Sequence, residues 1–397
     1  MNRPLEGITV VGLEQVIAGP FCTRQLAELG ARVIKIERPG GGDAARGYDR
    51  TVLGQSSHFV WVNRSKESLC LDMKHPGARP VLDKLLQKAD VFVQNLAPGA
   101  ADRLGLGAAE LRARHPALIW CGISGYGPAG PYAGKKAYDL LVQCEAGLLS
   151  VTGSPEAPAK AGIPVADIAA GMYAFSSILA ALLRKTRDGV GATIDVTMFE
   201  SLGEWMGFPA NFSAYGGTAP PRSGAHHATI VPYGPFAAGD GGTVFLSIQN
   251  EREFERFCDV VLAKPELKSD AKFSNGPARA QNRDAMHAEI DRIFSTLKAE
   301  QIIQRLEAAD IANAKLNSMH EFWRHPQLQA RDRWREVGTA AGPIRATKPP
   351  FNLDGLEPRM DAVPALGAHS LAILAELGFG IREIEKMKQE KIIQEDA

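Results

Sequence analysis

Residues 8–37, ITVVGLEQVIAGPFCTRQLAELGARVIKIE, decide the fold of this chain. An apolar run, Ile8–Leu13, is followed by a helical pattern, Pro20–Leu29, which Gly30 ends, and a second apolar run, Val33–Glu37, comes directly after it. A strand, a helix and a second strand joined by short turns are typical of a parallel sheet covered by helices. The stretch therefore predicts an α/β fold.

The same rhythm continues through the first half of the chain. A further helix is predicted at Val81–Lys88, and further strands at Val91–Gln94, Leu118–Ile123 and Ala192–Met198. We expect one large Rossmann-like domain whose ligands collect at the carboxyl ends of the strands. The turn after the first strand lacks the G-x-G-x-x-G spacing, so a dinucleotide is not the expected ligand.

The length of the chain favours a second domain, because single cores stop growing at about 250 to 300 residues and the chain has 397. Asn211–Ala225 is rich in glycine, proline and serine and is interpreted as a linker. An α+β pattern follows, with a strand at Thr243–Ile248 and helices at Glu251–Val261, Asn282–Leu297 and Ala299–Ala308. A charged helix, Ile381–Glu395, is expected to end the chain.

The composition points to a small-molecule partner. Lysine plus arginine and aspartate plus glutamate both total 45, so no global field attracts nucleic acid or a membrane. The five cysteines form no C-x-x-C motif, which favours reduced thiols and argues against a metal site. No signal pattern is present, and the apolar helices are too interrupted to span a bilayer. We expect a soluble, cytoplasmic protein.

The segment Gly162–Ala170, GIPVADIAA, places one carboxylate, Asp167, in an otherwise apolar stretch. Pro164 suits the first turn of a helix. Its apolar face is predicted to carry Ile168, Met172, Phe175, Ile178 and Leu182. A carboxylate near the positive end of the helix dipole is expected to stay ionised at neutral pH. Locally, Asp167 reads either as a cap of a core helix or as a reactive group.

A glycine run, Gly40–Gly42, follows the second predicted strand and is flanked by three cations, Lys35, Arg38 and Arg46. These side chains are candidates for phosphate binding, although charged residues beside glycines also form ordinary surface loops.

A series of short motifs extends over nearly the whole chain. They are Ala18–Pro20, Leu29–Arg38, Gly42-Asp43, Asn63–Ser68, Leu71–Lys74, Asn95–Gly99, Ser124–Pro128, Tyr138-Asp139, the Asp167 segment, Ile194–Glu200, Pro232–Gly234 and Pro364–Gly367. In this order the motifs resemble the class III CoA-transferases of the CaiB/BaiF type, and most closely the dicarboxylate-handling members.

The resemblance implies that Asp167 is the catalytic nucleophile. In that family the aspartate attacks an acyl-CoA to give an acyl-aspartyl anhydride, and CoA then forms an aspartyl-CoA thioester. A carboxylate nucleophile keeps the acyl group activated, whereas a serine would trap it as a low-energy ester. Coenzyme A and acyl-CoA are then substrates, and neither a tightly bound cofactor nor a metal is expected.

The resemblance also implies a set of CoA contacts. They are Val16, Ile17 and Ala18 beside the pantetheine, Arg38 and Arg103 at the phosphates, Leu71, Asp72, Met73 and Lys74 at the adenine, Asn95, Leu96 and Ala97 through the main chain, and Lys136 and Tyr138 at the thiol end. Two positions depart from the family pattern. Ile17 stands where formyl-CoA transferase has a glutamine, and Ala97 replaces a common arginine.

The substrate expectation is succinyl-CoA as donor and a dicarboxylate such as citramalate, itaconate or mesaconate as acceptor. A distal carboxylate needs a cation, for which Arg46 and Arg222 are candidates. His226 and His227 lie in a segment that resembles a loop of dicarboxylate-specific relatives and are further candidates.

Two alternatives stay open. The α-methylacyl-CoA racemases of the same superfamily use a histidine base, but the matching stretch here, Lys136–Asp139, has a tyrosine, whose pKa of ~10 makes it a poor base. A CoA-binding protein without catalysis is the other.

The resemblance further implies a domain plan and an interlocked homodimer. A large CoA-binding domain at residues 1–200 is followed by a linker at 201–225 and a small α+β domain at 226–325. Residues 326–397 then return to the large domain.

Overall fold

The computed structural model describes residues 3–394. The chain divides into two compact units. The first consists of Met1–Ala146, Gly162–Trp205 and Leu328–Ala397, and the second of Gly147–Ala161 and Met206–Gln327. The segment 147–161 therefore groups with the second unit, whereas the sequence placed it inside the large domain.

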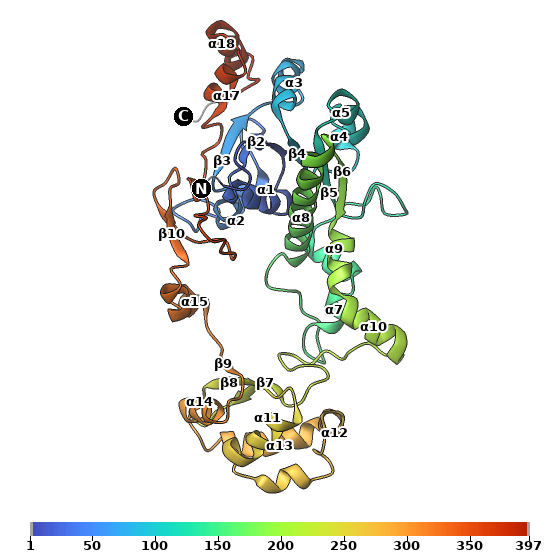
Figure 1. Cartoon of the computed structure of the whole chain (residues 1–397), viewed down its shortest axis with the longest axis vertical. Helices are drawn as coiled ribbons and strands as arrows, with labels where there is room; N and C mark the ends of the chain where they lie inside the picture. Colours follow the sequence, from blue (N-terminus) through green and yellow to red (C-terminus); the bar gives the residue numbers. More distant parts are fainter. Residues whose placement is uncertain (1–2, 395–397) are drawn as a thin grey trace. The chain divides into compact units, whose positions relative to one another are not determined.

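The first unit is built on a six-stranded parallel sheet with the order β3-β2-β1-β4-β5-β6 (Figure 1). Its strands are β1 (Thr9–Leu13), β2 (Arg32–Glu37), β3 (Lys66–Cys70), β4 (Val91–Gln94), β5 (Ile119–Ser124) and β6 (Thr193–Thr197). The α/β prediction is confirmed. Only β3 was not predicted as a strand, because its first residues are polar although they are buried. The strand order reverses between β1 and β4, and ligands of such sheets bind at this crevice.

Helices cover both faces of the sheet. On one face α3 (Arg79–Lys88), α5 (Ala108–Arg114), α17 (Ser370–Glu376) and α18 (Ile381–Gln389) enclose the main core with alternate residues of the strands. On the other, α1 (Ala18–Glu28) packs on α8 (Val165–Asp188), and α8 contacts β5, β6, α6 (Asp139–Glu145) and α9 (Met198–Trp205). Short helices α2 (Ser57–Val62) and α4 (Ala100–Arg103) and a hairpin, β10 (Trp334–Val337) and β11 (Ile344–Thr347), complete the unit.

The buried face of α8 differs from the predicted one. It consists mainly of small residues, namely Ala166, Ala169, Ala170, Gly171, Ala174, Ile178, Ala181 and Leu182, while Met172 is exposed. Small side chains allow α1 to come close. A Cβ added to Gly171 would lie 2.8 Å from the carbonyl oxygen of Ala18. The first turn of α1 is thereby held against the first turns of α8.

Contrary to the expectation of interrupted apolar helices, α8 is long and apolar enough, by length and composition, to cross a membrane. Its contacts with α1, β5 and β6 are those of a core helix of a globular domain.

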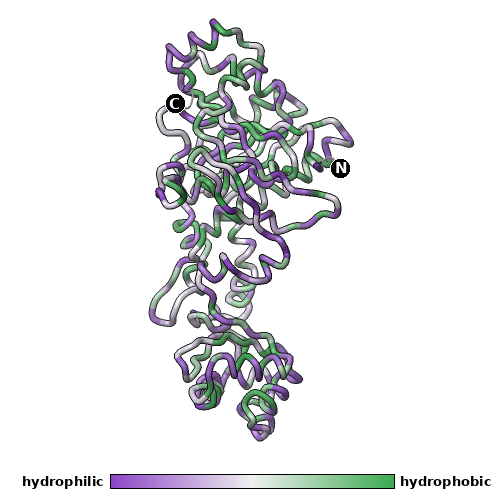
Figure 2. The backbone as a smooth tube through the Cα atoms, turned by 90° about the vertical axis from the view of Figure 1, so that its left-hand side faces the viewer, coloured by the Kyte–Doolittle hydropathy of each residue, from purple (hydrophilic) through white to green (hydrophobic). Residues whose placement is uncertain are grey.

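The second unit is an α+β structure with its own core. Three antiparallel strands, β7 (Tyr233–Ala237), β8 (Thr243–Ser247) and β9 (Asn313–Lys315), pack against helices. These are α11 (Glu251–Arg256), α12 (Gly276–Gln281), α13 (Arg283–Phe294) and α14 (Ala299–Ala308). The unit also contains two short helices, α7 (Leu148–Val151) and α15 (Met319–Trp323). Helix α16 (Pro326–Ala330) begins in the second unit and ends in the first. Hydrophobic and hydrophilic stretches alternate along its helices (Figure 2).

Part of the predicted linker at Asn211–Ala225 is helical. Helix α10 runs over Gly207–Gly216 and ends at Gly217, whose φ of 77° suits a left-handed cap. The glycine content that suggested a flexible linker therefore marks helix ends. Phe208 and Phe212, one turn apart, contact each other with ring centroids 6.0 Å apart.

Replacing Gly171 with alanine is expected to strain the crossing of α1 and α8. Gly203→Ala in α9 is the matched control, since a Cβ there meets nothing within 4 Å. Overpacking costs about 1–3 kcal/mol, while alanine gains about 1 kcal/mol of helix propensity at either site. Urea unfolding should therefore find Gly171→Ala less stable than Gly203→Ala. Equal stability of the two variants would contradict the close crossing.

Candidate active site

Asp167 lies in the first turn of α8, one helical turn before Gly171. A second carboxylate, Asp139 at the start of α6, caps the same helix. Its Oδ1 accepts hydrogen bonds from the backbone N–H of Ala166, at 2.8 Å, and of Asp167, at 3.4 Å. Gln143 Nε2 donates to Asp139 Oδ2 at 2.5 Å and fixes its orientation. The capping role that local sequence allowed for Asp167 is thus filled by Asp139.

The surroundings of Asp167 disfavour its charge. Burial and the charge of Asp139 raise the pKa of Asp167 to about 7, and the backbone N–H of Ala18 opposes this rise by hydrogen bonding to the carboxylate. The pKa of Asp167 is therefore raised, whereas the helix end alone predicted a carboxylate that stays ionised at neutral pH. A carboxyl group with a pKa near the working pH, in a crevice of an α/β sheet, is a candidate for covalent chemistry.

The donor Ala18 is the first residue of α1 and follows the loop Glu14–Ile17 that leaves β1. Ile17 and Ala18 are each 2 % exposed. Because Gly171 admits the first turn of α1 so closely, the N–H of Ala18 reaches Asp167. Backbone donors of this kind stabilise charge that develops on an oxygen during acyl transfer.

Tyr48 belongs to this site although the sequence gave no reason to choose it. Burial raises the pKa of Tyr48, and the nearby charges of Asp43, Tyr138 and Asp167 act in the same direction. Tyr48 therefore lies near each of these three side chains. Tyr48 comes shortly after the Gly40–Gly42 loop in the chain, and its side chain is half exposed. Only the three-dimensional position of this segment could have identified Tyr48 as part of the site.

The residues predicted to contact CoA lie mainly in segments that follow the carboxyl ends of strands. Val16–Ala18 follow β1, Arg38 follows β2, Leu71–Lys74 follow β3 and Asn95–Ala97 follow β4. Carboxyl ends of parallel strands meet at one edge, so the structure brings these segments together. Arg103 ends α4, and Lys136 and Tyr138 precede α6, all three exposed.

Within these segments the side chains differ in access. Leu71 is fully buried in the core, so its side chain is not available to a ligand, while Lys74 and Ala97 are exposed. Asn95 uses its amide on the loop after β1. Its Oδ1 accepts from the N–H of Gln15 at 2.7 Å, and its Nδ2 donates to the carbonyl of Gln15 at 2.8 Å.

Two of the three candidate phosphate ligands are engaged elsewhere. Lys35 is fully buried, and its Nζ donates to Asp43 at 2.8 Å. Arg46 forms two 2.8 Å hydrogen bonds to Glu37 and stacks on Phe59. Arg38 is exposed, and its Nε donates to the carbonyl of Gly42. The interpretation of Lys35 as a phosphate ligand is therefore wrong, and the charge of Arg46 is already balanced.

The other substrate-binding candidates belong to the second unit and have partners within it. Arg222 donates to the carbonyl oxygens of Ser154 and Pro155. The ring of His226 packs 4.6 Å from that of His287. His227 Nδ1 accepts from the N–H groups of Thr229 and Ile230, at 3.2 and 3.0 Å. These contacts give all three residues a structural role in the segment before β7.

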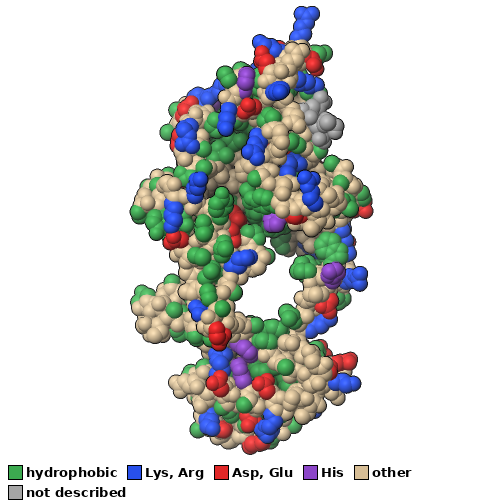
Figure 3. All heavy atoms as spheres, turned by 180° about the vertical axis from the view of Figure 1, so that it is seen from behind, with side chains coloured by type: hydrophobic (Ala, Val, Ile, Leu, Met, Phe, Trp, Pro, Cys, Tyr) green, Lys and Arg blue, Asp and Glu red, His purple; other side chains and the backbone are tan. Residues whose placement is uncertain are grey.

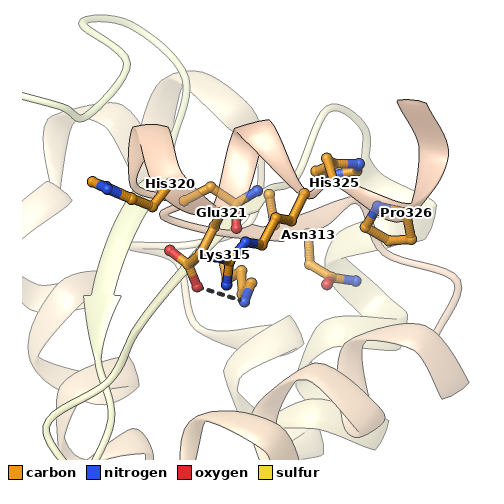
Figure 4. A pocket seen from close by; sticks show the side chains of 9 residues that line it. Asn313, Lys315, His320, Glu321, His325 and Pro326 are labelled. Atoms are coloured by element: carbon orange, nitrogen blue, oxygen red, sulfur yellow. Dashed lines mark hydrogen bonds and ion pairs between the residues drawn. The ribbon is translucent and has the colours of Figure 1, made fainter. Parts of the chain in front are cut away.

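The second unit also contains a pocket of about 570 Å³ that no sequence motif indicated (Figure 4). Its polar lining includes Lys315, His320, Glu321, Arg324 and His325. The dashed line marks the 3.0 Å ion pair between Lys315 and Glu321. None of the residues predicted from the sequence lines it. Over residues 3–394, no group of three or more His, Cys, Asp or Glu side chains is arranged to hold a metal ion.

The chain is similar to known proteins in sequence and in fold. The model of CoA-transferase family III matches residues 5–370. The chain is 37 % identical to acetyl-CoA:oxalate CoA-transferase from Acetobacter aceti over 83 % of this chain and 85 % of that protein. It is 32 % identical to succinyl-CoA:glutarate CoA-transferase from Mus musculus, covering 99 % and 91 % of the two chains. A crystal structure of a CaiB/BaiF family protein from Brucella suis is similar with a TM-score of 0.84 at 30 % identity, covering 95 % and 100 %.

Asp167→Asn is expected to stabilise the protein at pH 8. The pKa of Asp167 is about 7 in the folded state against a reference of 3.8, so the folded state binds more protons and wild-type stability falls as pH rises from 3.8 to 7. A shift of this size corresponds to about 4 kcal/mol, reduced by solvent screening to about 1–3 kcal/mol.

The measurement is chemical unfolding of wild type and Asp167→Asn at several pH values. The gain in the variant should be largest at pH 8 and vanish near pH 4. Asp188→Asn, which changes an exposed acid at the other end of α8, is the control and should show no such trend. A gain independent of pH would contradict the raised pKa.

Proposed function

The chain belongs to CoA-transferase family III, and from this premise we propose that it transfers CoA from an acyl-CoA to a carboxylic acid through Asp167. The observation that carries the proposal is the half-buried carboxyl group at the start of α8, with the N–H of Ala18 directed to it. Its partial burial shelters the carboxyl group from bulk water and raises its pKa to about 7, at which the ionised, nucleophilic form is still populated at neutral pH.

In the proposed reaction ionised Asp167 attacks the thioester carbonyl. The carbon–sulfur bond breaks, which leaves an acyl-aspartyl anhydride and CoA thiolate. The thiolate then attacks the carbonyl carbon of Asp167, and the donor acid leaves as a carboxylate, which gives the aspartyl-CoA thioester. An acceptor carboxylate reverses these steps. Each tetrahedral intermediate carries an oxyanion, which the N–H of Ala18 is placed to stabilise when it forms on Asp167.

The proposed acceptor is a dicarboxylate and the proposed donor succinyl-CoA. The names of the relatives from Acetobacter aceti and Mus musculus include oxalate, glutarate and succinyl-CoA. Citramalate, itaconate and mesaconate remain part of the proposal. Ile17, an apolar side chain in the loop before α1, offers no side-chain hydrogen bond to a small acid. CoA and acyl-CoA act as substrates, and the enzyme is proposed to work in the cytoplasm without a tightly bound cofactor.

A homodimer is part of the same proposal. Large apolar side chains reach the surface from the mutually packed α6, α8 and α9 and from the segment just before α8. They are Leu140, Leu141, Ile163, Met172, Leu183, Phe199 and Trp205. Figure 3 shows hydrophobic side chains at the surface of the face that it displays. Exposed apolar area of this extent favours an interface.

Light scattering at micromolar concentration should therefore give twice the mass of the 42.7 kDa chain. Burial of apolar side chains in the interface should keep the dimer intact at high salt, because hydrophobic association is not screened by ions. A stable monomer at that concentration would contradict the dimer.

The covalent intermediate is the decisive test of the activity. With acyl-CoA and no acceptor, a fraction of the enzyme should carry an aspartyl-CoA thioester at Asp167. Hydroxylamine should convert that residue to a hydroxamate, and peptide mass spectrometry of Ala161–Arg184 should locate it. A racemase or a passive CoA binder would give no adduct, and a racemase would instead exchange the α-proton of its substrate into deuterated water.

Asp167→Ala is the matched variant for this experiment. It should lose turnover and the adduct but keep CoA affinity in calorimetry, because the proposed CoA contacts lie on other segments. Turnover within a few-fold of wild type would mean that Asp167 is not the nucleophile.

A further inference from the structure

The loop between β1 and α1 contains a strained residue. Val16 has a φ of 62°, in the left-handed region that β-branched residues rarely adopt. Such a conformation persists only where the surroundings enforce it. Two residues later, Ala18 presents its N–H to Asp167. The contacts that enforce the conformation of Val16 therefore also determine where that donor lies.

Asp43 supplies one of these contacts. Its Oδ1 and Oδ2 accept from the N–H of Val16 at 3.0 and 3.2 Å, and Oδ1 also accepts from the N–H of Ala45 at 2.9 Å. The side chain is fully buried. Charged acceptors form stronger hydrogen bonds than neutral ones, so the carboxylate of Asp43 compensates for the strain at Val16.

The loop is held on its other side by Asn95. The amide of this residue, which follows β4, makes two hydrogen bonds to the backbone of Gln15, which follows β1. The loop is therefore bound from both sides of the crevice between β1 and β4, where the strand order reverses.

Asp43 is itself fixed by buried charges of opposite sign. Lys35 Nζ donates to Asp43 Oδ2 at 2.8 Å and to the carbonyl of Glu14 at 3.1 Å. Lys66 Nζ binds the carboxylate of Glu14 at 2.7 Å. Burial alone would raise the pKa of Asp43, but the charge and the hydrogen bond of Lys35 lower it below its usual value. Two carboxylates and two ammonium groups thus compensate one another in the interior.

We propose that Asp43 is a positioning residue for the reaction at Asp167, and that it acts by holding Val16 in its left-handed conformation so that the N–H of Ala18 stays directed at the Asp167 carboxylate. This inference rests on the proposed function. Asp43 contributes through the backbone of the loop and contacts neither CoA nor the acyl group.

The test is Asp43→Asn. The amide weakens the hydrogen bond to Val16, so turnover should fall at least tenfold with a smaller change in KM for acyl-CoA. Glu28→Gln is the control, because Glu28 is an equally buried carboxylate at the far end of α1, paired with Arg24 and Arg64. It should lower stability without a comparable loss of turnover.

A second change separates positioning from stability. Glycine adopts a φ of 62° without strain, so Val16→Gly added to Asp43→Asn should restore at least part of the lost turnover. A purely structural role for Asp43 predicts no such rescue. The proposal would be overturned if the turnover of Asp43→Asn were within twofold of wild type. It would also be overturned if adding Val16→Gly restored none of the lost turnover.

In Asp43→Asn the buried Lys35 loses its ion-pair partner, which can prevent folding. If Asp43→Asn does not fold, the double variant Asp43→Asn/Lys35→Met, which removes both charges, is used in its place. Failure of both variants to fold would overturn the proposal, because the pair would be required for folding and not for position.

A readout independent of turnover distinguishes this proposal from the proposed function. The pKa of Asp167 is obtained from the pH dependence of the stability difference between each protein and its Asp167→Asn counterpart. Asp139 and Tyr48 are titratable groups near Asp167, and both are retained in both members of a pair. Asp43→Asn should raise the pKa of Asp167, since the Ala18 donor is displaced. A wild type without transferase activity would refute the proposed function, whereas an unchanged pKa would refute only the positioning role.

Discussion

The site depends on one steric constraint, the close approach of the first turn of α1 to α8 at Gly171. A Cβ at this position would meet the carbonyl of Ala18 at 2.8 Å. The approach brings the first turn of α1 to the first turns of α8, so the carboxylate of Asp167 meets the backbone N–H of Ala18. Backbone donors are fixed by the fold and need no reorganisation when charge develops on an oxygen. The geometry therefore exists before any substrate binds.

The same arrangement creates an electrostatic conflict between Asp167 and Asp139. Asp139 satisfies two N–H groups of the first turn of α8, which stabilises the helix end, but its charge lies beside a second carboxyl group that is partly removed from water. The N–H of Ala18 relieves only part of the cost. An anhydride or thioester at Asp167 removes the charge of that residue altogether. In the reaction proposed above, acylated forms of Asp167 would therefore be favoured relative to the free carboxylate, which suits steps that run in both directions.

Much of this architecture follows from the sequence, because strands and helices with regular apolar spacing are determined locally. The strands at the start of the chain, helices α1 and α3 and the position of Asp167 in the first turn of α8 were predicted in this way. The errors come from tertiary effects. Strand β3 was missed because Lys66 and Ser68 are buried polar residues. The buried face of α8 was wrong because close packing selects small residues over large ones. The segment Asn211–Ala225 was interpreted as a linker, although its first residues belong to α10, because a helix end and a flexible segment can share a glycine-rich composition.

Charged residues were the least predictable part of the site, for a physical reason. A lysine or arginine beside glycines looks solvent-exposed in a sequence, but its charge is available to a ligand only if no carboxylate of the protein has already paired with it. Lys35 and Arg46 are paired with Asp43 and Glu37, partners that lie close to them in the chain. Pairing converts these cations from ligand-binding groups into supports of the backbone. This part of the unit accordingly contains two kinds of group. One is a rigid backbone, which holds Asp167 and its donor, and the other is a set of exposed cations such as Arg38, Lys74 and Arg103. In the proposed transferase the chemistry would depend on the first group and the affinity for an anionic substrate on the second, so the two properties could vary independently on one scaffold.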